Sequence, residues 1–161
     1  MRKEFDYLLN KLNNKRLPVI QEAEIAMHEL NNKLKPLIQK LTYKDFELLV
    51  DLIFTSSGWK RISILGKTEK YIDMVLVSPV NNKKAFVQVK SSSKLDEFKK
   101  YSKYFIEMKQ YDEMYYVVHT PDNKLDHIPE TNKNIKVITL NKITELTINS
   151  GLISWLIDKC S

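Results

Sequence analysis

Three polar side chains interrupt two apolar runs near the middle of the chain: Asp73, Gln88 and Lys90. The runs, 72–78 and 84–90, are rich in β-branched residues and flank a Pro/Asn turn signal, so they are predicted to form an antiparallel hairpin. Apolar residues fill nearly every other position, as is typical of strands that are covered on both faces.

These three side chains are expected to meet at one end of the hairpin. If the chain turns near Asn81, Asp73 lies almost opposite Val89. Gln88 and Lys90 then share one face beside the carboxylate, because side chains alternate along a strand. An acid, an amide and an ammonium are costly to group in a core. A metal ion and a phosphate would offset that cost, so the sequence predicts a site for both.

The elements that position the hairpin follow from helix caps and apolar periodicity. Thr42 is a predicted N-cap with Asp45 three residues on, and Gly58 ends the helix that carries Glu47. The further elements expected are a strand at 62–65, the hairpin at 72–90, a helix at 95–110, a strand at 114–119, a polar loop at 121–134, a strand at 135–140 and a closing helical pattern from 143.

This order predicts an α/β fold with a mixed β-sheet flanked by helices. The helix at 95–110 joins two strands that should lie parallel, because such a crossover returns the chain to the end of the sheet at which the first of the two strands began. We expect the globular domain to comprise residues 41–161 and a helical segment to comprise residues 1–40.

The N-terminal segment has its own apolar pattern. Residues 1–16 are typical of a short amphipathic helix, and a heptad pattern runs from Ile20 to Leu41, with Pro36 expected to kink or end the second helix near Lys35. The pattern fits a dimerising coiled coil or a helix laid across the domain that follows.

Composition limits the class of protein. The 161 residues carry a formal net charge of +6 and 43% hydrophobic residues, which indicates a globular chain suited to a polyanionic partner. Cys160 is the only cysteine, so a disulfide framework and a cysteine zinc site are excluded and a reducing cytoplasm is expected. The sequence has no apolar run of the ~20 residues that a membrane span needs.

Several short motifs together resemble one known family. These are Phe46-Glu47, Gly58-Trp59, Ile72-Asp73 and the run 87–90, Val-Gln-Val-Lys. They resemble the Mrr-like restriction endonucleases, a branch of the PD-(D/E)xK nuclease superfamily in which glutamine can replace the second acid. The resemblance covers roughly residues 41–140.

The resemblance implies a restriction-endonuclease-like core with the element order αβββαβ. It also implies a role for each matching residue. Asp73 corresponds to the metal-binding aspartate and Gln88 to the variant second acid. Lys90 corresponds to the catalytic lysine, and Glu47 to the acid of the first core helix.

The chemistry of phosphodiester hydrolysis accounts for the same residue types. Mg²⁺ prefers oxygen ligands, which Asp73, Gln88 and the Val89 carbonyl offer, and Mn²⁺ should substitute for it. Glu47 can hold a metal-bound water or a second ion. Lys90 is expected to orient the attacking water and to stabilise the developing negative charge.

Residues near the end of the hairpin are candidates for DNA contacts. Ser91 and Ser92 offer hydroxyl and backbone N–H groups for phosphate, or simply begin the next helix. Lys94, Lys99 and Lys103 either bind DNA or form a solvated face.

Each central residue also has a structural interpretation. Asp73 can cap the strand or pair with Lys90, Gln88 can satisfy backbone groups, and Glu47 can be a solvated helix residue. His119 is expected to be structural.

The leading hypothesis is a Mg²⁺-dependent DNA endonuclease of a restriction or defence system, with a homodimer formed through the N-terminal helices. The alternatives are an inactive nuclease-fold module for nucleic-acid binding or assembly, and a nuclease that acts on branched DNA or RNA.

Overall fold

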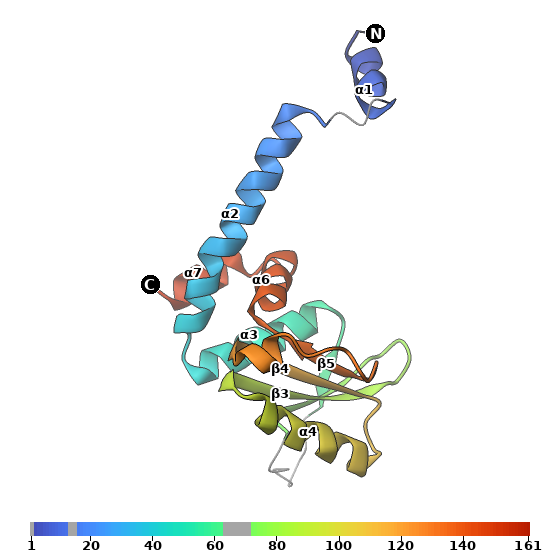
Figure 1. Ribbon diagram of the computed structural model, residues 1–161, viewed down its shortest axis with the longest axis vertical. Helices are drawn as coiled ribbons and strands as arrows, with labels where there is room; N and C mark the ends of the chain where they lie inside the picture. The colour runs from blue at the N-terminus through green and yellow to red at the C-terminus, as the bar shows by residue number, and fades with distance from the viewer. Residues whose placement is uncertain (1, 13–15, 63–71) are drawn as a thin grey trace. The chain divides into compact units, whose positions relative to one another are not determined.

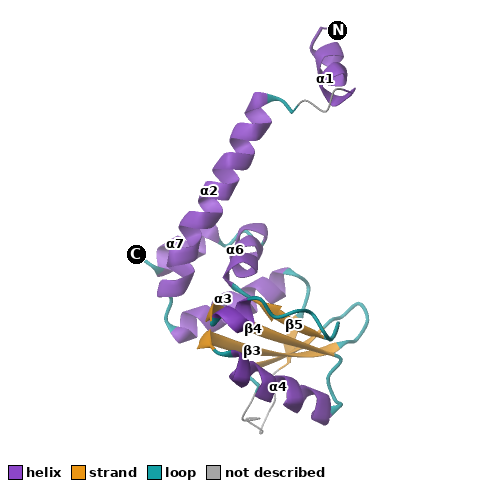
Figure 2. Ribbon diagram, in the orientation of Figure 1, coloured by secondary structure: helices purple, strands orange, loops and turns teal. Residues whose placement is uncertain are grey.

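The computed structural model describes residues 2–12, 16–62 and 72–161. The chain divides into two units, Met1–Lys33 and Leu34–Ser161. The first unit contains α1 (Arg2–Leu12) and the first part of α2 (Pro18–Lys40). The second unit is a β-sheet with helices on both faces (Figures 1 and 2).

The sheet has five strands in the order β1-β2-β3-β4-β5. The strands are β1 (Lys60–Ile62), β2 (Met74–Val77), β3 (Lys84–Ser93), β4 (Glu113–Pro121) and β5 (Ile135–Ile138). Strand β2 is antiparallel to both β1 and β3, whereas β3, β4 and β5 run parallel to one another. The mixed sheet, its central hairpin and the parallel crossover are therefore as predicted. The expected strand at 62–65 begins earlier, at Lys60, and its residues 63–65 lie outside the described residues.

Helices cover both faces of this sheet. They are α3 (Tyr43–Ser56), α4 (Leu95–Met108), α5 (Asn123–Asp126), α6 (Leu140–Asn149) and α7 (Ile153–Lys159). In Figure 1, α4 lies on the opposite face of the sheet from α3 and α6. The order αβββαβ, followed by a further strand and helices, confirms the predicted α/β fold of the restriction-endonuclease type.

Helix α3, which carries Glu47, begins and ends where its caps require. The Thr42 hydroxyl oxygen accepts a hydrogen bond from the Asp45 backbone N–H at 3.2 Å. At the other end Gly58 has φ +89°, a left-handed conformation that costs a residue without Cβ little. Five apolar residues on one stripe are buried: Phe46, Leu49, Val50, Ile53 and Phe54. That stripe fixes which way Glu47 points.

A second apolar cluster fills the space between the sheet and α4. Phe98, Tyr101 and Phe105 of α4 pack with Phe86 of β3 and Tyr116 of β4. Five consecutive residues of β3, 85–89, are buried. This confirms that β3 is covered on both faces, and it places the polar Gln88 inside a packed layer.

Some boundaries differ from the prediction. At Pro36 either a kink or an end of the helix was expected; the helix does not end there, and α2 continues to Lys40. Leu34 and Ile38 on either side are buried in the larger unit, so packing sustains a helix that proline alone would end. The polar loop 121–134 contains the short α5, and the closing pattern forms two helices separated by Gly151 at φ +69°. Helix α4 ends at Met108 rather than residue 110.

Candidate active site

The register of the hairpin decides which residues face Asp73. Met74 pairs with Val87, so Asp73 stands opposite Gln88 and not, as predicted, almost opposite Val89. The Asp73 backbone N–H donates to the Val87 carbonyl at 3.2 Å. The predicted position was one residue out, but Gln88 still contacts Asp73.

The Asp73 carboxylate is held by two donors from β3. Its Oδ2 accepts hydrogen bonds from Gln88 Nε2 and from the Val89 backbone N–H, each at 2.7 Å. Burial raises the pKa of Asp73 above its usual value, although the Val89 N–H and the Tyr43 hydroxyl act in the opposite direction. The Asp73 carboxylate is therefore partly buried and held by hydrogen bonds. A cation beside it would offset the cost of burying its charge.

Gln88 has one unsatisfied oxygen. The residue is 4% exposed, and its Oε1 is buried with no hydrogen-bond partner among the described residues. Because Nε2 donates to Asp73, the amide cannot turn its oxygen toward the same atom without losing that bond. A buried acceptor without a partner costs about 1–3 kcal/mol. The Gln88 amide thus bonds the side chain of Asp73 rather than a backbone group.

Glu47 lies close enough to Asp73 for the charge of Asp73 to shift the pKa of Glu47. Burial and then the negative charge of Asp73 raise the pKa of Glu47 above its usual value. Arg61 of β1 opposes this effect, with its Nη2 3.5 Å from Glu47 Oε1. Arg61 also lies 3.4 Å from Asp51 Oδ2 and donates to the Asp73 carbonyl at 3.3 Å. Glu47 thus belongs to a charged cluster beside Asp73.

Lys90 points toward α4. Its Nζ lies 3.0 Å from Glu97 Oε1 and 5.3 Å from the centre of the Tyr101 ring. Burial alone would lower the pKa of Lys90, but its contacts with Tyr101 and Glu97 outweigh burial and raise that pKa above the usual value. Lys90 is therefore a cation near neutral pH. Among the described side chains its ion pair is with Glu97, so the alternative of a salt bridge to Asp73 is not what the structure has.

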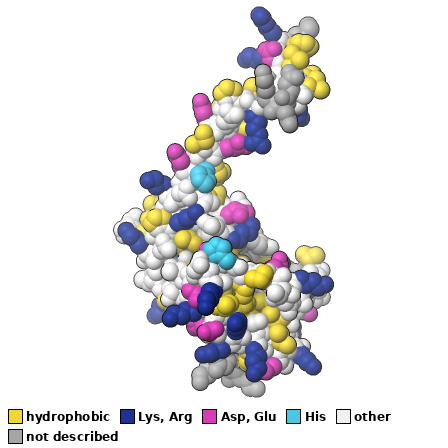
Figure 3. Space-filling view, viewed as in Figure 1, with side chains coloured by type: hydrophobic (Ala, Val, Ile, Leu, Met, Phe, Trp, Pro, Cys, Tyr) yellow, Lys and Arg dark blue, Asp and Glu magenta, His cyan; other side chains and the backbone are white. Residues whose placement is uncertain are grey.

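The structure places the predicted DNA contacts in two settings. Ser91 and Ser92 belong to β3, and Ser92 pairs with Thr120 of β4, so these serines do not begin the helix. Lys94, Lys99 and Lys103 are exposed at or on α4. In Figure 3 lysine and arginine side chains lie over α4, with acidic side chains among them.

His119 lies in the layer between β4 and α3. It is 5% exposed and its ring contacts the Phe46 ring edge-on at 4.7 Å between centroids. Its Nδ1 is 2.8 Å from the Thr120 hydroxyl, and its Nε2 has no partner among the described residues. Burial lowers the pKa of His119, which favours the neutral ring. These contacts are those of a packed residue.

Three residues near the site were not found from the sequence: Tyr43, Arg61 and Glu97. Tyr43 had a detectable signal, because it precedes Glu47 by four residues on a predicted helix and so shares its face. The Tyr43 hydroxyl bonds to Asp73, and burial raises the pKa of Tyr43 to about 12. Arg61 and Glu97 had no comparable signal, because their partners depend on how distant elements pack.

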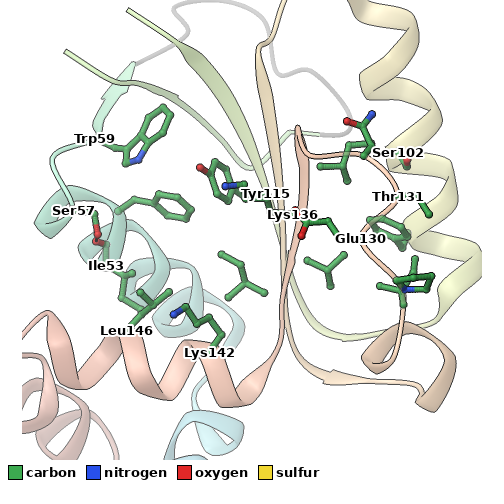
Figure 4. Close-up of a pocket in the computed structure, with 18 of the residues that line it drawn as sticks. Ile53, Ser57, Trp59, Ser102, Tyr115, Glu130, Thr131, Lys136, Lys142 and Leu146 are labelled. Atoms are coloured by element: carbon green, nitrogen blue, oxygen red, sulfur yellow. Dashed lines mark hydrogen bonds between the residues drawn. The ribbon is translucent and has the colours of Figure 1, made fainter. Parts of the chain in front are cut away.

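A cavity of about 580 Å³ lies elsewhere, around β5 (Figure 4). Trp59 and Tyr115 line one side of it, and Ser102 of α4 lines another. None of the predicted site residues lines this cavity. Gln88 and Lys90 lie instead on β3, which contributes no residue to the lining of this cavity.

The comparison with protein families bears on this arrangement directly. The Mrr catalytic-domain family, described as restriction endonuclease, matches residues 38–145. The chain belongs to this family. The match spans α3, the whole sheet, α4 and most of α6, and so includes every residue of the site described above. No curated protein and no solved structure matches the chain.

Membership of the restriction endonuclease family makes this domain a nuclease domain, and therefore of the hydrolase class. Within the described part of the chain, no helix has the length and apolarity to cross a bilayer.

Proposed function

We propose that this chain is a Mg²⁺-dependent endodeoxyribonuclease of a restriction or defence system, with Asp73, Gln88, Lys90 and Glu47 as its active site. The observation that carries this proposal is the buried contact between the Asp73 carboxylate and Gln88, whose Oε1 has no hydrogen-bond partner among the described residues. The Gln88 amide oxygen and the Asp73 carboxylate are oxygen ligands of the kind that a hard cation prefers. Burial raises the pKa of Asp73, and a bound cation would offset that cost of burying its charge.

The residues present can hold a divalent metal ion, although few of their ligand atoms are charged. Within the described residues no three histidine, cysteine, aspartate or glutamate side chains gather to hold one. A metal here would use Asp73, the Gln88 amide oxygen and the Val89 carbonyl, with Glu47 holding a bound water or a second ion. With one carboxylate replaced by an amide, we expect weaker metal binding than at a site with two acids. When bound, Mg²⁺ polarises the phosphate and lowers the pKa of water; Mn²⁺ should substitute.

The chain's own residues have separate tasks in this proposal. A bound cation would neutralise Asp73, and the Gln88 amide could then turn its oxygen, instead of its Nε2, toward the cation. Lys90, held protonated, donates to the attacking water or to a phosphate oxygen and stabilises the charge that develops there. Lys90 is thus not the base. Tyr43 keeps Asp73 ionised and oriented by donating its hydroxyl.

DNA binding is proposed for the residues beside this site. Ser91 and Ser92 lie near the end of β3, the strand that carries Lys90, and Lys94 directly follows that strand. Lys99 and Lys103 lie one turn apart on the exposed side of α4. Contacts from lysines and hydroxyls to phosphate position a duplex without reading its sequence. The net charge of +6 favours such a partner.

We also propose that residues 41–161 form the nuclease domain and that residues 1–40 pair two copies of the chain. Helix α1 buries no residue, and Phe5, Leu8 and Leu12 are 63%, 55% and 82% exposed. Ile20 and Met27 of the α2 heptad are also exposed. Apolar surface of this kind is typically covered by a partner helix. Two sites related by two-fold symmetry would cut both strands of a duplex. The single cysteine is consistent with a cytoplasmic enzyme.

Sedimentation equilibrium tests the pairing. The full chain should be a dimer at tens of micromolar, and a chain beginning at Leu34, which keeps Leu34 and Ile38 in the core of the larger unit, should be a folded monomer. A monomeric full chain would contradict the pairing, and a dimeric truncated chain would show that the pairing surface lies in the nuclease unit rather than in the N-terminal segment.

Cleavage of supercoiled plasmid DNA tests the proposed activity. The purified chain should nick or linearise the plasmid with Mg²⁺ or Mn²⁺ and be inert in EDTA. Parallel reactions with linear, single-stranded and branched DNA and with RNA identify the substrate class. DNA binding without cleavage of any substrate would favour an inactive nuclease-fold module, and cleavage that persists in EDTA would contradict the proposed metal dependence.

A further inference from the structure

The neutral amide at position 88 leaves Lys90 without an acidic neighbour on its own strand. Asp73 Oδ2 is already occupied by Gln88 Nε2 and the Val89 N–H, both at 2.7 Å. A flexible lysine with no fixed acceptor samples many rotamers, which weakens any catalytic contact that it makes. Some other group must therefore hold the ammonium in one place.

Helix α4 supplies that group. Glu97 Oε1 is 3.0 Å from Lys90 Nζ, and Tyr101, one turn further on, places its ring 5.3 Å below the same nitrogen. The two side chains come from one helix and approach Lys90 from the same side. Charge-assisted hydrogen bonds of this length are among the stronger contacts in proteins and have a defined direction.

Glu97 is itself anchored to the core. Its second oxygen, Oε2, accepts a hydrogen bond from the Ser93 hydroxyl at 3.0 Å. The Ser93 Oγ lies 2.6 Å from the Tyr116 hydroxyl, and Tyr116 is fully buried between the sheet and α4. The Phe98 ring packs against Tyr116 at 5.3 Å between centroids. A continuous series of contacts therefore leads from the packed interior to the ammonium of Lys90.

Another ion pair on the same helix shows what an ordinary surface contact looks like here. Lys103 and Glu107 are 3.8 Å apart at the usual spacing of four residues, and their side chains are 78% and 63% exposed. The Lys90 and Glu97 side chains are 26% and 38% exposed, and the pair joins β3 to α4. Exposed pairs of this kind contribute little to stability. The Lys90–Glu97 pair is thus better suited to fixing a position than to holding the fold together.

We propose that Glu97, held by Ser93, is the positioning residue of this nuclease: it fixes the Lys90 ammonium for contact with the reacting phosphate. The inference rests on the proposed function of the site, because it needs Lys90 to act in cleavage. Glu97 itself touches neither metal nor substrate. Glu97 lies on a neighbouring helix and orients the Lys90 ammonium, which an acid at position 88 would otherwise do.

The test is single-turnover cleavage with saturating enzyme, together with DNA affinity measured without metal. Glu97→Ala should lower the cleavage rate constant at least about tenfold while the Kd for DNA stays within about twofold. Glu97→Gln should lose less, because its amide oxygen still accepts from Lys90. Ser93→Ala should lose an intermediate amount, and the double variant Ser93→Ala/Glu97→Ala should be no slower than Glu97→Ala alone. Glu107→Gln, which removes the same charge from the same helix, is the matched control and should cleave as the wild type does.

Each other outcome is informative. A wild type that cleaves and a Glu97→Ala variant that cleaves equally fast would overturn the positioning role while the proposed function stands. Faster cleavage by Glu97→Ala would also overturn it, by showing that Glu97 restrains Lys90 from the substrate. Additive losses in the double variant would show that Ser93 does not act through Glu97. A wild type without any cleavage would instead contradict the proposed function itself.

Discussion

Replacing Gln88 with glutamate tests the site at its most buried contact. Gln88 Nε2 now donates to Asp73 Oδ2 at 2.7 Å, and the residue is 4% exposed. Gln88→Glu changes the shape very little, but it sets a second carboxylate against the first. Without metal the variant should be destabilised, and with Mg²⁺ the same two charges should bind the cation more tightly.

The size of the effect can be bounded in two ways. Two charges about 4 Å apart repel by about 4 kcal/mol at an effective dielectric constant of 20. Alternatively the new carboxyl takes up a proton, and holding a group of pKa about 4.3 protonated at pH 7 also costs about 4 kcal/mol. Water reaching the edge of the site reduces both figures, so we expect a loss of about 2–4 kcal/mol. The variant remains folded if the domain has ordinary stability, about 5–15 kcal/mol.

Thermal unfolding in EDTA and in a Mg²⁺ series measures both effects. At about 3 °C per kcal/mol for a domain of this size, Gln88→Glu should lower Tm by about 6–12 °C in EDTA. Mg²⁺ should then raise its Tm by more than it raises that of the wild type, since a tenfold tighter Kd adds about 1.4 kcal/mol at saturation. Gln39→Glu adds the same charge at an exposed position and is the control. An unchanged Tm in EDTA, or equal Mg²⁺ increments in the two proteins, would refute the assignment of Gln88 to the metal site.

Two further predictions concern the layer behind the site. Phe46 is fully buried, so Phe46→Ala should lower the free energy of unfolding in urea by about 3–5 kcal/mol, whereas Leu48→Ala at a 40% exposed position of the same helix should cost under about 1 kcal/mol. Similar losses in both would contradict the assigned core. Burial lowers the pKa of His119, so the unfolded state binds the proton more readily than the folded state. The contribution of His119 to stability should therefore be constant above about pH 6.5, and stability should fall as the pH drops toward the lowered pKa. His119→Asn should flatten that decline and His127→Asn, an exposed control, should not; an equally steep decline in both would show that His119 is not the cause.

The hairpin and the first core helix were predictable because their signals are local. Thr42 and Gly58 mark the ends of α3 through their own side chain and backbone freedom, and β-branched runs mark the strands. The predicted register was one residue out because the geometry of the turn could not be predicted from the sequence. The hairpin closes with the Ser78 N–H donating to the Lys83 carbonyl at 2.9 Å, and Asn82 adopts φ +57°. A register shift of one residue changes which side chain faces Asp73.

The candidate site was predictable in its central members and not in its surroundings. Asp73, Gln88 and Lys90 lie on one hairpin, so short-range pairing brings them together. Glu97 and Arg61 reach the site only because α4 and β1 pack where they do, which depends on contacts far apart in the sequence. The course of α2 through Pro36 is a similar case, since burial of its neighbours outweighs the local preference of proline.

Metal-dependent cleavage of DNA by Asp73 and Lys90 is the activity that we propose for this chain. The most direct measurement compares the wild type with Asp73→Ala and Lys90→Ala in single-turnover plasmid cleavage with Mg²⁺, with DNA binding measured on the same preparations. The site as described predicts that both variants bind DNA and lose cleavage by about a hundredfold or more. Cleavage at the wild-type rate in both variants would contradict it, because the hydrolysis would then come from residues outside this site or from another enzyme.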